Sequence, residues 1–218
     1  MIWVSESIIS LTNVSKQFRR KTALHNLDFA LIANNVYGFS GPNGSGKTLT
    51  FKVILGFVKA TTGTVIVKGD KIREDRLFAP DIGFAIHEYG PLPTKTGREN
   101  LALLAILAGT PANKISELLR YVGLDPEDDR LVRDYSLGMT QRLLIATALI
   151  GDAPIVILDE PTNALDEDGQ AFLVAMIADL KQRRKTVLVS SHDAAFLERV
   201  SDHIFYYREG TIFRERVK

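Results

Sequence analysis

The chain has 218 residues, enough for a sizeable core in one domain or in a domain with an inserted subdomain. Its 27 basic and 26 acidic residues give a net charge of +1, so no charge excess indicates nucleic acid or an anionic membrane as a direct partner. Cysteine is absent from the sequence, which excludes disulfides, thiolate metal sites and cysteine nucleophiles.

Two features predict that the chain neither carries a secretion signal nor spans a membrane. Residues 1–7 lack a basic leader followed by an apolar stretch. The most apolar runs, residues 101–108 and 143–150, are far shorter than the roughly 20 residues of a spanning helix. Any transport that the protein drives would therefore pass through another polypeptide.

The first part of the chain has the pattern of strands. Near-alternation of apolar and polar residues predicts strands at 8–11 and 23–32, and residues 36–40 have the composition of a buried strand. A helix is expected at 49–58, with further strands at 63–68 and 81–86.

The second part begins with helical spacing. Residues 98–150 carry apolar faces interrupted near 109–111 and 125–126. Strands are predicted at 155–158 and 186–190, a helix at 168–182 between them, and a hairpin near 209–210. Strands that alternate with helices indicate a largely parallel sheet with covered faces, and the helical middle resembles an insert in that core.

A glycine-rich segment follows the strand at 36–40. Residues 41–48, GPNGSGKT, match the pattern G-x-x-x-x-G-K-[ST]. Glycines let backbone N–H groups turn toward an anion, and the following helix adds its positive N-terminal end. Lys47 could reach the terminal phosphates of a nucleotide, and the Thr48 hydroxyl could ligate Mg²⁺. A flexible surface turn is the alternative, but a turn requires neither the lysine nor the apolar strand before it.

Two carboxylates end the strand predicted at 155–158. Asp159 could hold Mg²⁺ directly or through water, and Glu160 could orient or deprotonate the attacking water. Ligands gather at the carboxyl ends of strands in parallel sheets. A turn with capping acids is the alternative, and the phosphate loop elsewhere in the chain argues against it.

With these motifs in order, the chain resembles the nucleotide-binding subunit of an ABC transporter over nearly its whole length. The discriminating segment is YSLGMTQR at 135–142, which resembles the family signature L-S-G-G-Q. Tyr135, Leu137 and Met139 depart from that signature, whereas Ser136 and Gly138 are retained. In the family this segment binds the γ-phosphate held by the other subunit, so the resemblance implies that each site is completed in trans.

The resemblance assigns further residues. Asp166 matches the loop that runs across the dimer interface, and it could also simply cap a helix. His192 matches the switch histidine that contacts the γ-phosphate, and Phe18 matches the aromatic residue that stacks on adenine. A core aromatic is the alternative for Phe18. Catalysis would fall to Glu160, His192 and Lys47.

His87 stands where most relatives carry a glutamine that contacts Mg²⁺ or the water and touches the membrane subunit. Mg²⁺ prefers oxygen ligands, so imidazole is a poor direct replacement. We therefore expect that His87 acts through water or that Glu88 takes part of the role. Turnover and metal occupancy that survive His87→Ala would support a marginal role, whereas lost ATPase activity with retained nucleotide binding would refute it.

The resemblance therefore predicts a RecA-like P-loop core at 1–89 and 151–218 with an N-terminal antiparallel β region, and a helical subdomain at 90–150. The metal ligands would be Thr48, Asp159 and His87. The nucleotide contacts would be Phe18, Gly41, Pro42, Asn43, Gly44, Ser45, Gly46, Lys47, Thr48, Leu49, His87, Ser136, Gly138 and Asp166.

The expected cofactors are ATP and Mg²⁺. The expected partners are a second ATPase subunit, identical or homologous, and a separate membrane-spanning subunit, with no nucleic acid. The chain would sit at the cytoplasmic face of the cell membrane, and its variant signature favours export over import. The alternative is a soluble ABC ATPase acting on ribosomes or DNA. A single nucleotide-binding unit, the lack of a long coiled coil and the neutral charge argue against it.

Overall fold

The computed structural model describes residues 7–218, so the expectation of no secretion signal falls almost wholly outside the described residues. The strands are β1 (Ser7–Phe18), β2 (Lys21–Ile32), β3 (Val36–Ser40), β4 (Thr62–Val67), β5 (Asp70–Lys71), β6 (Ile82–Ala85), β7 (Ile155–Leu158), β8 (Thr186–Ser191), β9 (His203–Arg208) and β10 (Thr211–Val217). The helices are α1 (Lys47–Ile54), α2 (Gly97–Ala108), α3 (Asn113–Tyr121), α4 (Leu137–Leu149), α5 (Glu167–Gln182) and α6 (Ala194–Val200), with short 3-10 turns at His87–Tyr89 and Val132–Asp134.

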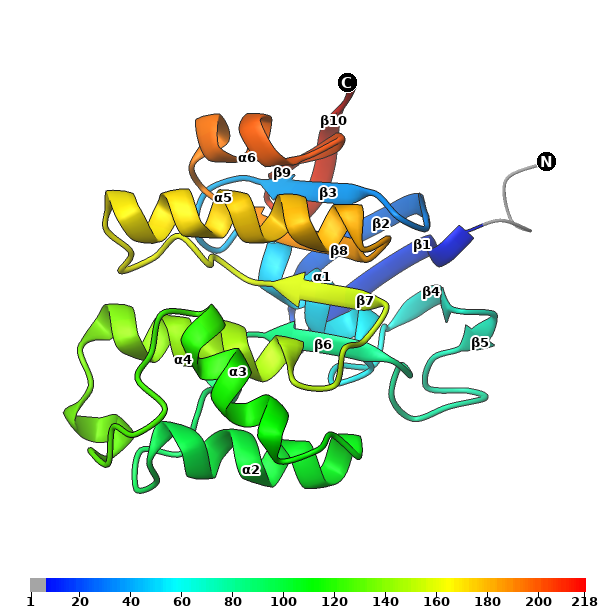
Figure 1. Ribbon diagram of the computed structural model, residues 1–218. Helices are drawn as coiled ribbons and strands as arrows, with labels where there is room; N and C mark the ends of the chain where they lie inside the picture. The colour runs from blue at the N-terminus through cyan, green and yellow to red at the C-terminus, as the bar shows by residue number, and fades with distance from the viewer. Residues whose placement is uncertain (1–6) are drawn as a thin grey trace.

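A central sheet has the strand order β10-β9-β3-β8-β7-β6 (Figure 1). Its pairs are parallel except for the antiparallel pair β9–β10 at one edge. Side chains alternate between the two faces of each strand, so Val187 and Val189 enter one apolar cluster while Leu188 enters the other. A sheet buried on both faces explains why β7 reads as an unbroken apolar run and why β8 carries three consecutive apolar residues at 187–189.

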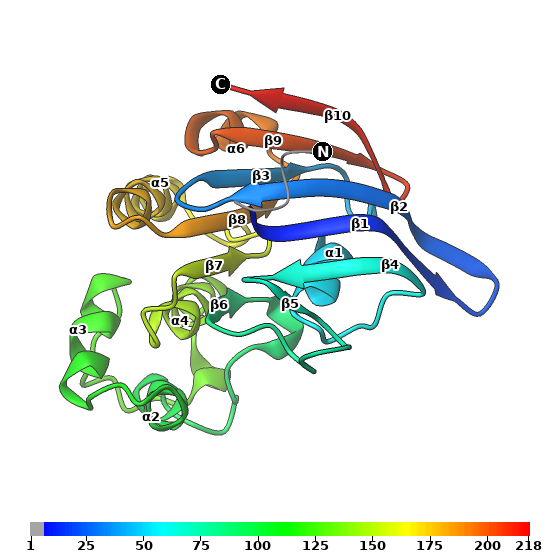
Figure 2. The same cartoon turned by 90° about the vertical axis from the view of Figure 1, so that its right-hand side faces the viewer.

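The second sheet, β2-β1-β4-β5, is antiparallel. Helix α1 lies between the two sheets (Figure 2), where Phe51 and Ile54 are fully buried among residues of both. The predicted parallel core with an N-terminal antiparallel β region is therefore confirmed.

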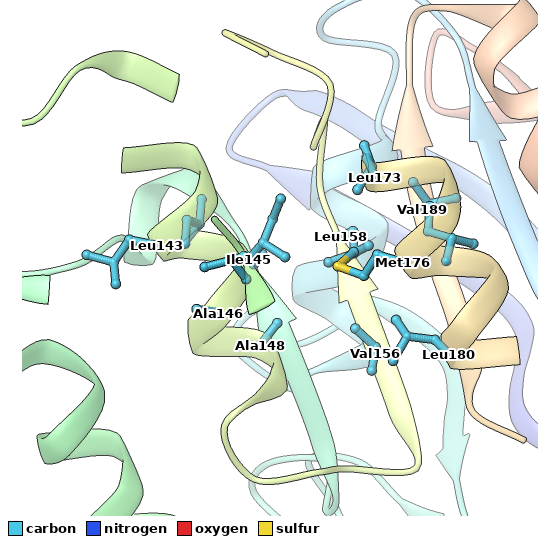
Figure 3. Close-up of a cluster of buried hydrophobic side chains, with 14 of the residues drawn as sticks. Leu143, Ile145, Ala146, Ala148, Val156, Leu158, Leu173, Met176, Leu180 and Val189 are labelled. Carbon is cyan, nitrogen blue, oxygen red and sulfur yellow. The ribbon is translucent and has the colours of Figure 1, made fainter. Parts of the chain in front are cut away.

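The opposite face of the central sheet packs against α4 and α5 (Figure 3). Met176 of α5 lies against Leu158 of β7, and Leu173 and Leu180 lie one turn to either side of it. All four side chains are at most 2% exposed. This cluster fixes the strand that carries the two acids of the candidate site.

Truncation of Met176 to alanine should therefore lower the free energy of unfolding by about 2–5 kcal/mol, the usual cost of a buried large-to-small change. Denaturant titration would measure it. The matched control is Leu77→Ala, because Leu77 is 57% exposed and its truncation opens no cavity. Equal destabilisation by the two changes would contradict the packing described above.

Helices α2, α3 and α4 lie between β6 and β7 in the sequence and form a group beside the sheet (Figure 1). Thr96 and Glu99 make a capping box at the start of α2, and Gly109, with φ 65°, caps its C-terminal end. The expected break near 109–111 is confirmed, and residues 125–126 also lie between helices. Among residues 7–218, no helix combines the length and the apolar character needed to cross a membrane.

Some boundaries were wrong. The helix expected at 49–58 begins at Lys47 and ends at Ile54, because Gly56 follows with φ 80° and a Cβ there would lie 2.5 Å from the Leu77 carbonyl oxygen. The strand expected at 8–11 runs to Phe18 through irregular pairings that interrupt the alternation. Helix α6 was not expected at all. The hairpin at 209–210 is confirmed.

Candidate nucleotide-binding and hydrolysis site

The glycine-rich loop lies between the carboxyl end of β3 and the start of α1. Gly46 is the N-cap of α1, has φ 112° and supplies no side-chain hydrogen bond to the first turn. A Cβ at this position would lie 2.9 Å from Leu24 Cδ2. A larger residue is therefore disfavoured both by this close contact and by the positive φ. Backbone N–H groups at an uncapped helix start, aligned with the helix dipole, form an anion-binding cradle.

Lys47 is buried beneath this loop. Its Nζ donates hydrogen bonds to the carbonyl oxygens of Gly41 (2.6 Å) and Pro42 (3.1 Å). The Ser45 hydroxyl is also buried, and it has no hydrogen-bond partner within residues 7–218. A buried cation and an unpaired hydroxyl inside an anion-binding cradle fit a polyphosphate.

The Asp159 carboxylate follows β7 and lies beside the start of α1. Its Oδ2 accepts a hydrogen bond from Thr48 Oγ1 (2.7 Å), and its Oδ1 accepts one from Ser190 Oγ (2.6 Å). Burial raises the pKa of Asp159, and these two hydrogen bonds partly offset that rise. The hydroxyl and carboxylate oxygens gathered here are the donors that Mg²⁺ prefers.

The Glu160 carboxylate lies between the side chains of a lysine and a histidine. Its Oε1 is 3.1 Å from Lys47 Nζ, and its Oε2 is 2.9 Å from His192 Nδ1. The backbone of Glu160 adopts φ 48°, an uncommon conformation for a residue with a Cβ, and its N–H donates to Ser190 Oγ at 2.8 Å. Strands β3, β7 and β8 thus bring Lys47, Asp159, Glu160 and His192 to one edge of the sheet.

The signature segment lies at the start of α4. Ser136 caps this helix by accepting a hydrogen bond from Met139 N at 3.2 Å. A Cβ on Gly138 would lie 3.1 Å from the Ala164 carbonyl oxygen, and Asp166 caps α5 by accepting from Gly169 N at 2.9 Å. Among the described residues, no hydrogen bond or ion pair joins Ser136, Gly138 or Asp166 to the glycine-rich loop.

Two other predicted site residues are exposed. Phe18 lies at the end of β1, is 49% exposed, and has Lys16 Nζ 4.8 Å from its ring centroid. The alternative interpretation of Phe18 as a core aromatic is therefore not supported. His87 is exposed in its 3-10 turn, and the neighbouring Glu88 carboxylate pairs with Lys52 of α1.

Two contacts were missed from the sequence. Ser190 bridges the two acids, and the only sequence signal for it is a polar residue after three apolar ones. Gly210, in the hairpin turn, donates its N–H to the Ser45 carbonyl oxygen at 2.8 Å. The C-terminal hairpin therefore holds the glycine-rich loop from a distance of more than 160 residues in the sequence.

A parallel sheet that presents a glycine-rich loop, a lysine at a helix start and two strand-end acids defines a P-loop nucleoside triphosphatase. Residues 24–163 match the model of the ABC transporter family. The chain belongs to this family as an ATP-binding, ATP-hydrolysing subunit.

Relatives and solved structures agree with this assignment. The bacitracin transport ATP-binding protein BcrA of Bacillus licheniformis is 36% identical over 96% of this chain and 69% of its own length. The lantibiotic transport ATP-binding protein SrtF of Streptococcus pyogenes is 35% identical over 96% of this chain and 90% of its own length. The dimeric structure of MJ0796, described as a bacterial ABC transporter cassette, has a TM-score of 0.88 at 28% identity and covers 96% of this chain and 98% of its own.

Proposed function

We propose that the chain hydrolyses Mg²⁺-bound ATP in a head-to-tail dimer and thereby drives export through a separate membrane subunit. The observation that carries this proposal is the Glu160 carboxylate, held between Lys47 and His192 at the end of β7. Residues 1–89 and 151–218 would act as the ATPase core, and residues 90–150 as the subdomain that presents the signature to the second subunit.

The chemistry follows from the positions of the side chains. Lys47 would leave the loop carbonyls to bind the terminal phosphates, and Thr48 and Asp159 would hold Mg²⁺, which neutralises phosphate charge when bound. Glu160 would accept a proton from the attacking water, and His192 would hold that carboxylate in place from its other side. His87 presents a nitrogen donor, which fits Mg²⁺ poorly, so we assign it a water-mediated contact.

The dimer would complete each site. Ser136 and Gly138 lie at the exposed start of α4, where backbone N–H groups and the helix dipole favour an anion. Since within residues 7–218 no hydrogen bond or ion pair joins either residue to the glycine-rich loop of its own chain, we assign both to the ATP held by the partner subunit. Contacts that exist only with the γ-phosphate in place would be lost on hydrolysis, and the dimer would open.

The relatives favour transport, and export in particular, over action on ribosomes or DNA. BcrA and SrtF are named as bacitracin and lantibiotic transport ATP-binding proteins. A similar protein of Burkholderia lata, 32% identical, is named as a Nod factor export ATP-binding protein. We therefore place this chain at the cytoplasmic face of the membrane, bound to a membrane subunit.

We assign the docking of that subunit to an apolar groove. A cavity of about 720 Å³ lies between α2, the end of α4 and the segment that follows β6, and its wall includes Phe84, Tyr89, Leu103 and Leu107. Leu107 is 84% exposed and Leu103 46% exposed, so apolar side chains of the groove are open to solvent, as at an interaction site. Tyr89 follows His87 by two residues, so the groove would adjoin the water-mediated contact that we assign to His87. A short amphipathic helix of the membrane subunit would fit it.

Replacing Leu103 and Leu107 together with aspartate should weaken binding to the membrane subunit by at least about tenfold, because buried apolar area is lost and charge is buried instead. The measurement is retention of the chain on its detergent-solubilised membrane subunit. The control for added charge on the same helix is Ile106→Asp beside the single Leu107→Asp variant, since Ile106 is 78% exposed but does not line the groove. Unchanged retention of the double variant, with unchanged ATPase activity, would reject the groove as the docking site.

A further inference from the structure

One serine side chain forms hydrogen bonds with both acidic residues of the site. Ser190, on β8, donates its hydroxyl hydrogen to Asp159 Oδ1 at 2.6 Å, and its Oγ accepts a hydrogen bond from the Glu160 N–H at 2.8 Å. A serine hydroxyl has one hydrogen to donate, so this geometry fixes its direction. The side chain is fully buried near the carboxyl end of β8, a central strand of the sheet.

The contact with Glu160 supports a strained backbone. Glu160 has φ 48°, which costs free energy for a residue that carries a Cβ and persists only where its surroundings hold it. Among residues 7–218, Ser190 Oγ is the hydrogen-bond partner of the Glu160 N–H. Without the hydroxyl, this N–H would be left unpaired at a partly buried position, and the peptide could relax toward an ordinary conformation.

The contact with Asp159 is charge-assisted and therefore strong for a hydrogen bond. Thr48 occupies the other oxygen of the same carboxylate. Without the Ser190 hydroxyl, the Asp159 carboxylate would be held by Thr48 alone and could rotate. The glycine-rich loop would keep its own contacts. The next residue along the strand does not duplicate this role, because Ser191 Oγ instead accepts from Asp193 N at 3.0 Å.

We propose that Ser190 is a positioning residue for hydrolysis: it sets the direction of the Glu160 carboxylate through the backbone of residue 160 and fixes the rotamer of Asp159. The inference rests on the proposed function, since it acts through the two acids to which that function assigns the chemistry. It predicts that loss of the hydroxyl lowers turnover and leaves ATP binding nearly unchanged.

The test is Ser190→Ala in the full-length chain. Turnover at saturating ATP should fall about 10- to 100-fold, the effect of losing one hydrogen bond to a charged group and one to a strained backbone. The dissociation constant of a fluorescent ATP analogue should change less than about threefold, since the loop and Lys47 are untouched. The control is Ser201→Ala, because Ser201 is also a buried serine but bonds to neither acid.

A double variant separates positioning from general loss of structure. In a Glu160→Gln background, Ser190→Ala should lower the residual turnover by less than about threefold, because residues that act as a unit are not additive. If the wild type is active and the Ser190→Ala turnover lies within about twofold of it, the inference is overturned but the proposed function is not. An equal loss of turnover in Ser201→Ala would have the same meaning. A Glu160→Gln variant as active as the wild type would instead overturn the proposed function.

Discussion

The Glu160→Gln variant should bind ATP as the wild type does and lose about 100- to 10,000-fold in hydrolysis, the usual contribution of a general base. Glutamine keeps the size of the side chain and its contact with His192, which now lies 2.9 Å from Oε2. It cannot accept the proton from water. Because ATP would then persist, the variant should accumulate as a dimer in the presence of ATP, and size-exclusion chromatography would detect it.

The control for this experiment is Glu198→Gln. Glu198 is an exposed carboxylate on α6 that pairs with Arg216, so its loss changes net charge equally without touching the site. A Glu160→Gln protein that stays monomeric and fully active would reject both the assigned role of Glu160 and the shared site.

The Gly138→Asp variant should lose at least about 100-fold in ATPase activity while each subunit still binds ATP, since loss of one preorganised anion-stabilising group costs about that much. The new carboxylate would stand at the start of α4, where the proposed function places the γ-phosphate held by the partner subunit. Its Cβ would also come within 3.1 Å of the Ala164 carbonyl oxygen. Steady-state ATPase assays and nucleotide titration would separate the two effects.

The matched control is Asn113→Asp, which adds the same charge at the exposed first position of the neighbouring helix α3. It should leave the ATPase activity unchanged. Mixing Gly138→Asp with Lys47→Ala protein should restore activity, because one site of the mixed dimer has an intact loop and an intact signature. No recovery in the mixture, with mixed dimers present, would argue against completion in trans.

The sequence predicted best those functional residues that belong to a short motif with its own characteristic secondary structure. The motif GPNGSGKT follows one apolar strand, and two acids follow another. These two motifs predicted the phosphate loop, the strand-end acids and the parallel core, because each motif occurs with a particular secondary structure. The roles of Ser136, Gly138, Asp166 and Phe18 stay predictions, since they depend on a nucleotide and on a second subunit.

Other features depend on contacts between distant segments, which no local pattern reveals. Ser190 looks like an ordinary strand end until β8 is placed beside β7. The same holds for Gly210, whose turn contacts the loop through Ser45. Helix α1 ends early because Gly56 meets the segment at Leu77, and β1 was underestimated because its bulges break the alternation.

The central claim is that each ATP site is shared between two subunits, and the most direct test is the ATPase rate per subunit as a function of protein concentration. The account predicts a rate that rises steeply with concentration as dimers form and that vanishes in the Glu160→Gln variant. A rate per subunit that is independent of concentration, in a protein shown to be monomeric, would mean that the site is complete within one chain and would contradict the account.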